Sequence, residues 1–171
     1  MERFDQDGRE PHHPVLYQPI ITALKPASPG RYVDATVGAG GHAAGILQAS
    51  APAGQLIGFD LDPQALALAK ARLHPFSDRF WLFHSSYIHL KEKLQAQGWQ
   101  SVNGILIDLG VSSMQLDQAE RGFSFLKDGP LDMRFDPARG MSAADLINSL
   151  PAEELAEIFW RFGEEREARR L

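Results

Sequence analysis

The sequence contains no cysteine. This absence excludes disulfide bonds, thiolate nucleophiles and cysteine-ligated zinc, and it fits a reducing compartment. No apolar stretch approaches the roughly 20 residues that cross a bilayer, and residues 1–14 lack the apolar core of a signal peptide. We therefore expect a cytoplasmic protein with no membrane partner. The six histidines show no metal-ligand spacing such as HExxH, so no metal site is predicted.

The sequence also has no excess of basic residues. The chain has 17 lysines and arginines against 22 acidic residues, which gives a formal net charge of −5. No global positive field attracts a polyanion, so any contact with nucleic acid must be local. With 171 residues, of which 44% are hydrophobic, the chain is long enough to bury one core with a small appendage.

Short apolar runs alternate four times with helical patterns. The expected strands are 31–35, 55–59, 80–84 and 102–107, and the expected helices are 15–24, 43–48, 63–73 and 88–97. Alternation of this kind is typical of a parallel sheet with crossover helices. The sequence therefore predicts an α/β fold, and ligands of such folds bind outside the carboxyl ends of the strands.

A glycine-rich loop follows the first expected strand, within YVDATVGAGGHAAGIL. Gly38, Gly40 and Gly41 can adopt positive φ angles and let the backbone approach a ligand closely. Asp60 ends the second expected strand, roughly 20 residues later, where dinucleotide-binding folds hold a ribose hydroxyl. A purely structural turn between strand and helix remains an alternative for the glycine loop alone. Together, the loop and Asp60 favour a nucleotide-type cofactor.

Residues 108–117, DLGVSSMQLD, come directly after the apolar run 105–107. They place a carboxylate, two hydroxyls and a carboxamide just past a buried strand, where chemistry is expected in an open α/β sheet. The alternative is a strand followed by a capped turn, because Asp and Ser commonly end strands and begin helices. Both interpretations stay open at this point.

The segment after Gln118 changes character. Its glycines and prolines predict an ordered irregular loop. The loop interleaves basic residues with aromatic ones, as single-stranded nucleic-acid surfaces often do, and these basic residues are Arg121, Lys127, Arg134 and Arg139. Alternatively, the arginines form ion pairs with Asp128, Asp132 and Asp136.

Two helices are expected after this loop. Ser142 is predicted to cap a short helix that reaches Ser149, with Asp145 in its first turn. Pro151 opens the second helix, whose apolar stripe is predicted to be core and consists of Leu155, Ile158, Phe159 and Phe162.

Several motifs, GAGGH, FDLDP, HSSY, DLGVSSMQLD and ERGFSFLKDGPLDMRFDP, resemble those of the bacterial ribosomal RNA small-subunit methyltransferase H (MraW) family. The resemblance begins at His13 and reaches the last residue. It implies a Rossmann-like class I methyltransferase sheet, present here as its first four strands, and the start of a small helical insertion domain. The cofactor domain would then be residues 1–118, and residues 119–171 would form the substrate loop and the start of the insertion.

The resemblance also implies methylation of the exocyclic N4 of a cytidine in 16S rRNA of the small ribosomal subunit, with S-adenosyl-L-methionine as cofactor. The family's cofactor contacts fall on Gly40, Gly41, His42, Asp60, Tyr87, Asp108 and Gln115. Strand-end and loop positions add Asp34 and Gly38 to this set. Catalysis is expected from Asp108, with Ser112 and Ser113 positioning the base. Contacts to RNA are expected from Arg121, Lys127 and Arg134.

Two other functions compete with this one. A nicotinamide-dependent oxidoreductase would use the glycine loop and Asp60, but it leaves DLGVSS without a role. A non-catalytic S-adenosylmethionine-binding fragment is the second, because family members are about twice as long as this chain.

The chain ends within a pattern that predicts a charged helix over residues 164–171. We therefore expect a fragment or a truncated gene product. In such a fragment the fourth strand has one unpaired edge, and an apolar strand with unpaired backbone groups is an association site. We expect either a homodimer through this exposed sheet edge or poor solubility.

Overall fold

In a computed structural model of the protein, residues 14–171 are described. They belong to two compact units, which divide the chain into Met1–Leu109 and Gly110–Leu171. The predicted domain boundary at residue 118 stays a prediction. Across the described residues, no helix is both long and apolar enough to span a membrane.

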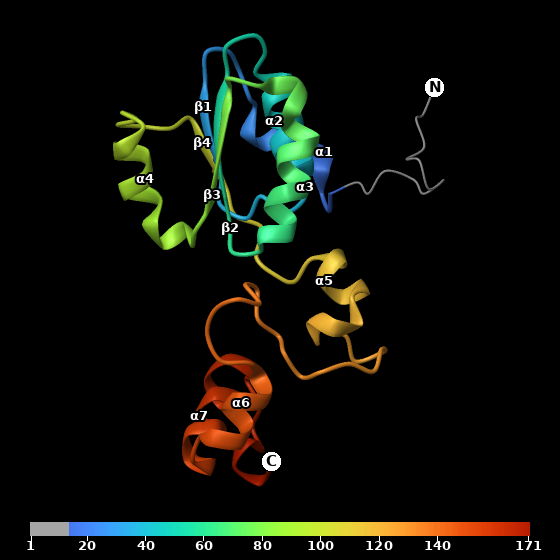
Figure 1. Cartoon of the computed structure of the whole chain (residues 1–171). Coiled ribbons are helices and arrows are strands. Elements are labelled where there is room, and N and C mark those ends of the chain that lie inside the picture. Colours follow the sequence, from blue (N-terminus) through green and yellow to red (C-terminus); the bar gives the residue numbers. More distant parts are fainter. Residues whose placement is uncertain (1–13) are drawn as a thin grey trace. The chain divides into compact units, whose positions relative to one another are not determined.

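The first unit contains a sheet of four parallel strands in the order β3-β2-β1-β4, which confirms the predicted α/β fold (Figure 1). Its strands are β1 (Arg31–Asp34), β2 (Gln55–Asp60), β3 (Phe80–His84) and β4 (Gly104–Leu106). Strand β4 is shorter at both ends than predicted, and side-chain hydrogen bonds flank it there. The Asn103 side chain accepts the N–H of Arg31, and the Thr36 hydroxyl accepts the N–H of Asp108.

Helices cover both faces of this sheet. The helices α1 (Tyr17–Leu24), α2 (Gly41–Ala49) and α3 (Pro63–Leu73) lie on one side, and α4 (Leu90–Ala96) lies on the other (Figure 1). Two cores result: Tyr32 and Leu56 pack toward the first face, and Val33 and Ile57 toward the second. The two central strands are buried on both faces, and their inner residues Tyr32, Val33, Leu56 and Ile57 are accordingly apolar on both sides.

Two helices begin later than the sequence predicted. Leu16 has a left-handed conformation with φ of 55°, so α1 begins at Tyr17 and not at residue 15. The predicted helix 88–97 is divided into a 3₁₀ turn, Tyr87–His89, and α4. The hydroxyl of Ser86 caps the turn by accepting the N–H of Ile88.

Strand β4 lies at the edge of the sheet, as predicted. Within residues 14–171 it pairs with β1 alone. Its Ile105 is 45% exposed, although the residue beside it in register, Val33, is fully buried. Both the outer edge of β4 and part of one face therefore lack cover in the first unit.

The second unit is mainly helical. It contains α5 (Ser113–Asp117), α6 (Ala143–Ser149) and α7 (Ala152–Gly163), with 3₁₀ turns at Ala119–Arg121 and Ala168–Arg170. The predicted irregular loop occupies residues 122–142. The predicted cap of α6 is confirmed, since Ser142 and Asp145 each accept the backbone N–H of the other.

Two predictions about the last helix are wrong. Phe162 is 75% exposed, so the apolar stripe of α7 is core only at its partly buried residues Leu155, Ile158 and Phe159. A continuous charged helix over residues 164–171 is also wrong, because Glu164 adopts a left-handed conformation with φ of 52° and ends α7. The Glu165 side chain then accepts the N–H of Glu167 and stabilises the turn that follows.

Candidate functional site

Three carboxylates gather at one edge of the sheet in the first unit. Asp34 ends β1, Asp60 ends β2, and Asp108 follows β4. Strand β1 lies between β2 and β4, and Asp34 is in register with Gly58 and Leu106. All three acids therefore lie at the carboxyl edge of the sheet, where the sequence placed the ligand site.

Asp60 connects the glycine loop with the start of α3. Its Oδ2 accepts the N–H of Gly38 at 2.8 Å, and its Oδ1 accepts the N–H of Asp62 at 2.9 Å. Asp62 caps α3 by accepting the N–H of Gln64. Burial raises the pKa of Asp60 above its ordinary value, and these N–H donors oppose the rise. The structure thus brings together Gly38 and Asp60, which the sequence assigned to one site.

The three glycines of the loop have different reasons to lack a side chain. A Cβ on Gly40, whose φ is 80°, would lie 3.1 Å from the Cα of Ala69, and a Cβ on Gly41 would collide with the side chain of Pro14. Gly38 has φ of 52°, but the nearest atom to its Cβ position is the Thr36 carbonyl oxygen at 3.9 Å. Close packing explains why Gly40 and Gly41 have no side chain, whereas the missing side chain of Gly38 leaves open space beside Asp60.

Asp34 is almost completely buried, with 1% of its surface exposed. Its Oδ1 accepts the N–H of Thr36 at 3.3 Å, and its Oδ2 has no hydrogen-bond partner among the described residues. Burial raises the pKa of Asp34 to about 7, and the charges of Asp60 and Asp108 add to the rise. A buried carboxyl oxygen without a donor fits a ligand that brings a positive charge or an N–H or O–H group.

Thr36 belongs to the site, and the sequence analysis missed it. Its Oγ1 accepts the N–H of Asp108 at 2.8 Å, across 72 residues of chain, and its own N–H donates to Asp34. Thr36 therefore joins the ends of β1 and β4. No local pattern indicates this role, because the contact depends on the two strands being neighbours.

His42 and Tyr87 lie in different surroundings. His42 is buried, with its Nε2 3.1 Å from the carbonyl oxygen of Val15 and its ring stacked on Tyr17. Tyr87 is exposed, at the start of the 3₁₀ turn after β3. The N–H of Ser85 donates to the carbonyl of Asp60, which places the HSSY segment beside the end of β2. Contact of His42 and Tyr87 with a cofactor stays a prediction.

The second unit contains the remaining predicted residues of DLGVSSMQLD, and there they form the capped turn of the alternative interpretation. The Oγ of Ser112 accepts the N–H of Gln115 at 3.2 Å, and the Gln115 Oε1 accepts the N–H of Ser112 at 3.0 Å. Ser113 is the first residue of α5. The predicted roles of these three side chains in binding and catalysis stay predictions.

The basic side chains predicted in this segment have hydrogen-bond or ion-pair partners inside the second unit. Arg121 is only 4% exposed, and its Nη2 donates to the carbonyls of Arg134 and Phe135. The side chain of Arg134 pairs with Asp132 and lowers the pKa of that carboxyl to about 2. The Nε of Arg139 lies 3.3 Å from the Oδ2 of Asp136, and the Nζ of Lys127 lies 3.6 Å from the Oδ1 of Asp117. The alternative of ion-paired arginines therefore holds for Arg134 and Arg139.

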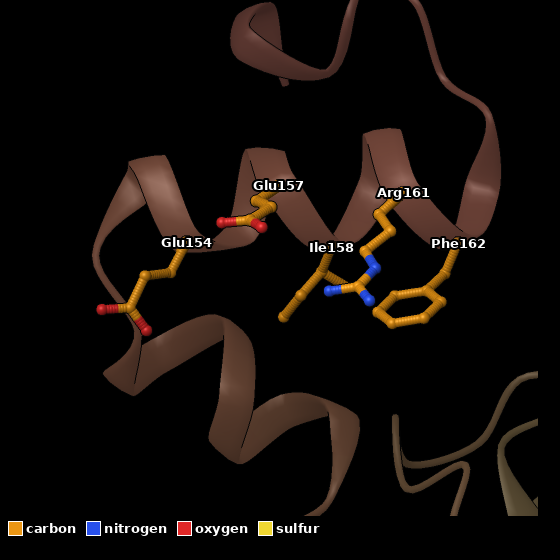
Figure 2. Close-up of a pocket in the computed structure, with 5 residues that line it drawn as sticks. All are labelled: Glu154, Glu157, Ile158, Arg161 and Phe162. Carbon is orange, nitrogen blue, oxygen red and sulfur yellow. The ribbon is translucent and has the colours of Figure 1, made fainter.

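A hollow on α7 contains none of the predicted site residues. Figure 2 shows its lining, which comes from one helix and consists of Glu154, Glu157, Ile158, Arg161 and Phe162. The Arg161 guanidinium lies over the Phe162 ring, 5.3 Å from the ring centre. Within residues 14–171, no cluster of three or more His, Asp or Glu side chains is arranged to hold a metal ion.

Comparisons with known proteins agree on one family. The sequence model of the MraW methylase family matches residues 9–171. Ribosomal RNA small subunit methyltransferase H of Citrifermentans bemidjiense is 51% identical over 160 residues, which cover 94% of this chain and 51% of that protein. The protein of the same name from Thermomicrobium roseum is 50% identical over 157 residues, which cover 92% and 48%. This chain thus spans about half the length of the curated relatives that it matches.

A solved structure shares the fold. The crystal structure of a putative rRNA-methylase from Clostridium thermocellum matches with a TM-score of 0.50 and 19% sequence identity. The match covers 59% of this chain and 53% of the other. At this level of identity the likeness concerns the fold alone.

The bond between Thr36 and Asp108 leads to a testable prediction. Thr36→Val keeps the shape of the side chain but removes the acceptor of the Asp108 N–H. We expect a loss of about 0.5–1.5 kcal/mol in the free energy of unfolding and faster hydrogen exchange at the Asp108 amide. Denaturant unfolding and amide exchange measure the two effects. Thr36→Ser, which keeps the hydroxyl, is the matched control, and equal exchange in both variants would refute the assignment.

Proposed function

Because the chain belongs to the MraW methylase family, we propose that it supplies the cofactor-binding half of an S-adenosylmethionine-dependent methyltransferase that acts on 16S rRNA. The observation that carries the proposal is the group of Asp34, Gly38 and Asp60 at the carboxyl edge of the sheet. It combines an acidic residue beside a glycine loop with a buried acceptor that lacks a donor. The proposed substrate implies a cytoplasmic protein.

The residues at this edge suit the cofactor, which carries a ribose and a sulfonium cation and supplies the methyl group. A carboxylate has about four lone-pair sites. Asp60 uses two of them for Gly38 and Asp62, which leaves acceptor capacity for ribose hydroxyls. The open space at Gly38 admits a ligand against the backbone, and Asp34 supplies negative charge. Gly40, Gly41, His42, Tyr87 and Gln115 complete the proposed set.

The proposed substrate atom is the exocyclic N4 of a cytidine. This nitrogen is a poor nucleophile, because its lone pair is delocalised into the ring. A hydrogen-bond acceptor beside it localises the lone pair and takes the departing proton. We assign this role to the carboxylate of Asp108, whose backbone Thr36 holds in place.

The second unit would then position the RNA. Ser112 and Ser113 are proposed to orient the base, although the oxygen of Ser112 already accepts the N–H of Gln115. We propose contacts to RNA from Lys127 and Arg134. Arg121 is buried and holds two loop carbonyls, so we assign to it the shape of the loop instead of a direct contact.

The cofactor site yields a second prediction. Asp60→Ala should weaken S-adenosylmethionine binding by about 1.5–3 kcal/mol, because hydrogen bonds that involve a charged group are in this range. Isothermal titration calorimetry measures the loss. Asp128→Ala removes an exposed acid from the second unit and should leave binding unchanged. Equal affinity of the Asp60 variant and the parent chain contradicts the assignment, and binding of NAD in place of S-adenosylmethionine would favour the oxidoreductase.

A third prediction concerns methyl transfer. The chain spans half the length of its relatives, so we expect it to methylate 30S particles very slowly or not at all by itself. In a full-length relative, replacing the counterpart of Asp108 by asparagine should reduce turnover more than cofactor affinity, if the carboxylate acts chiefly in the transition state. Single-turnover kinetics and calorimetry separate the two quantities. Equal losses would instead make Asp108 a cofactor ligand only.

The open edge of β4 leads to a fourth prediction, that a second copy of the chain pairs there. The motive is that β4 has one neighbour within the described residues and that Ile105 is half exposed. Light scattering should show a homodimer or larger aggregates, and Ile105→Lys should shift the chain toward the monomer. Ile147→Lys changes an isoleucine of α6 with similar exposure, 47%, and should have no such effect. A monomer at high concentration with well-protected β4 amides would overturn the proposal.

A further inference from the structure

Asp34 is the most completely buried acid of the sheet edge, and its hydrogen bonds are incomplete. One oxygen accepts a single N–H, from Thr36 at 3.3 Å, and the other has no partner among residues 14–171. An ionised carboxylate is costly to bury unless it is paired and hydrogen-bonded. In the empty site, the geometry therefore favours the neutral carboxylic acid.

The charges around Asp34 act in the same direction. From β2 it faces Asp60, and from the end of β4 it faces Asp108. On α2, His42 is already engaged with the carbonyl of Val15, and α1 has no charged residue. The two charges that act on Asp34 are thus both negative. Burial, together with these two acids, raises the pKa of Asp34 to about 7.

On the premise that the chain binds S-adenosylmethionine as proposed above, we propose that Asp34 is protonated before the cofactor binds and releases its proton to the solvent on binding. The cofactor brings a positive charge to the edge of the sheet, and this charge stabilises the carboxylate that burial alone disfavours. No covalent bond of the cofactor changes in this step. One proton leaves Asp34 for each cofactor bound, and the site gains one negative charge.

The sign of the pH dependence follows from this exchange. Below about pH 7 the binding of the cofactor must expel a proton from Asp34, so the affinity for the cofactor falls as the pH falls. Above about pH 7 Asp34 is already ionised, and the affinity becomes independent of pH. In the empty protein the same raised pKa has the opposite consequence. The neutral form stabilises the fold, and its contribution is lost as the pH rises from about 4 to about 7.

Calorimetry in two buffers tests the proposal. Titrations of S-adenosylmethionine in phosphate and in imidazole, which both buffer between about pH 6 and about pH 8 but differ in ionisation enthalpy, give the number of protons released. We expect nearly one proton at about pH 6 and almost none at about pH 8, with about fivefold weaker binding at pH 6 than at pH 7. Asp34→Asn should abolish this release and the pH dependence. At about pH 6 the cofactor's own amino group, whose ordinary pKa is about 8, stays protonated, so a release from this variant equal to that of the parent chain would overturn the proposal. Asp128→Asn, at an exposed acid, should behave like the parent chain.

A second measurement does not require the cofactor. The carboxyl carbon resonance of Asp34 in the empty protein should titrate with a midpoint near 7, and a midpoint near the ordinary 3.8 overturns the proposal. Binding with equal heats in both buffers also overturns it, while leaving the proposed function intact. A total absence of binding overturns both, and the two failures are therefore distinguishable.

Discussion

The first unit must keep three carboxylates together at one edge of a parallel sheet. This constraint arises because β1, β2 and β4 all end on the same side, each with an acid at or just after its end. Like charges at short range repel, and burial makes the repulsion stronger. The backbone N–H groups of Gly38, Thr36 and Asp62 donate hydrogen bonds to Asp34 and Asp60 and so reduce the electrostatic cost of burying these carboxylates. The loop after β1 has the conformation that places the N–H groups of Thr36 and Gly38 beside them.

The fold was predictable where local signals and the hydrophobic pattern agreed. Helix α3 has the predicted bounds because Pro63 occupies its first turn and Asp62 caps it. Strand β3 also has the predicted bounds. Strand β4 does not, and at its ends Asn103 and Thr36 make side-chain hydrogen bonds between segments that are 72 residues apart, which no local pattern indicates. The end of α7 was missed since Glu164, a residue with no preference for the left-handed region, adopts it there.

The site was predictable to the extent that its parts are close in sequence. Gly38 and Asp60 follow from a glycine loop and a strand end at a familiar spacing, and the structure joins them by a hydrogen bond. Thr36 was not predictable, because its partner lies 72 residues away. The burial of Arg121 was also missed. A basic residue among aromatics is typical of an RNA surface, but a guanidinium with five donors suits loop carbonyls equally well.

A structural role and a functional role are compatible in the same side chain when hydrogen-bonding capacity remains. Asp60 holds the loop with two acceptor sites and keeps others for a ligand, and Asp34 keeps one whole oxygen. In the capped turn Ser112 and Gln115 each accept the backbone N–H of the other, as Asp60 accepts those of Gly38 and Asp62. A bond within the fold therefore does not remove a side chain from the proposed site, and the Asp34 oxygen that has no partner among the described residues is the acceptor with most to gain from a donor on the ligand.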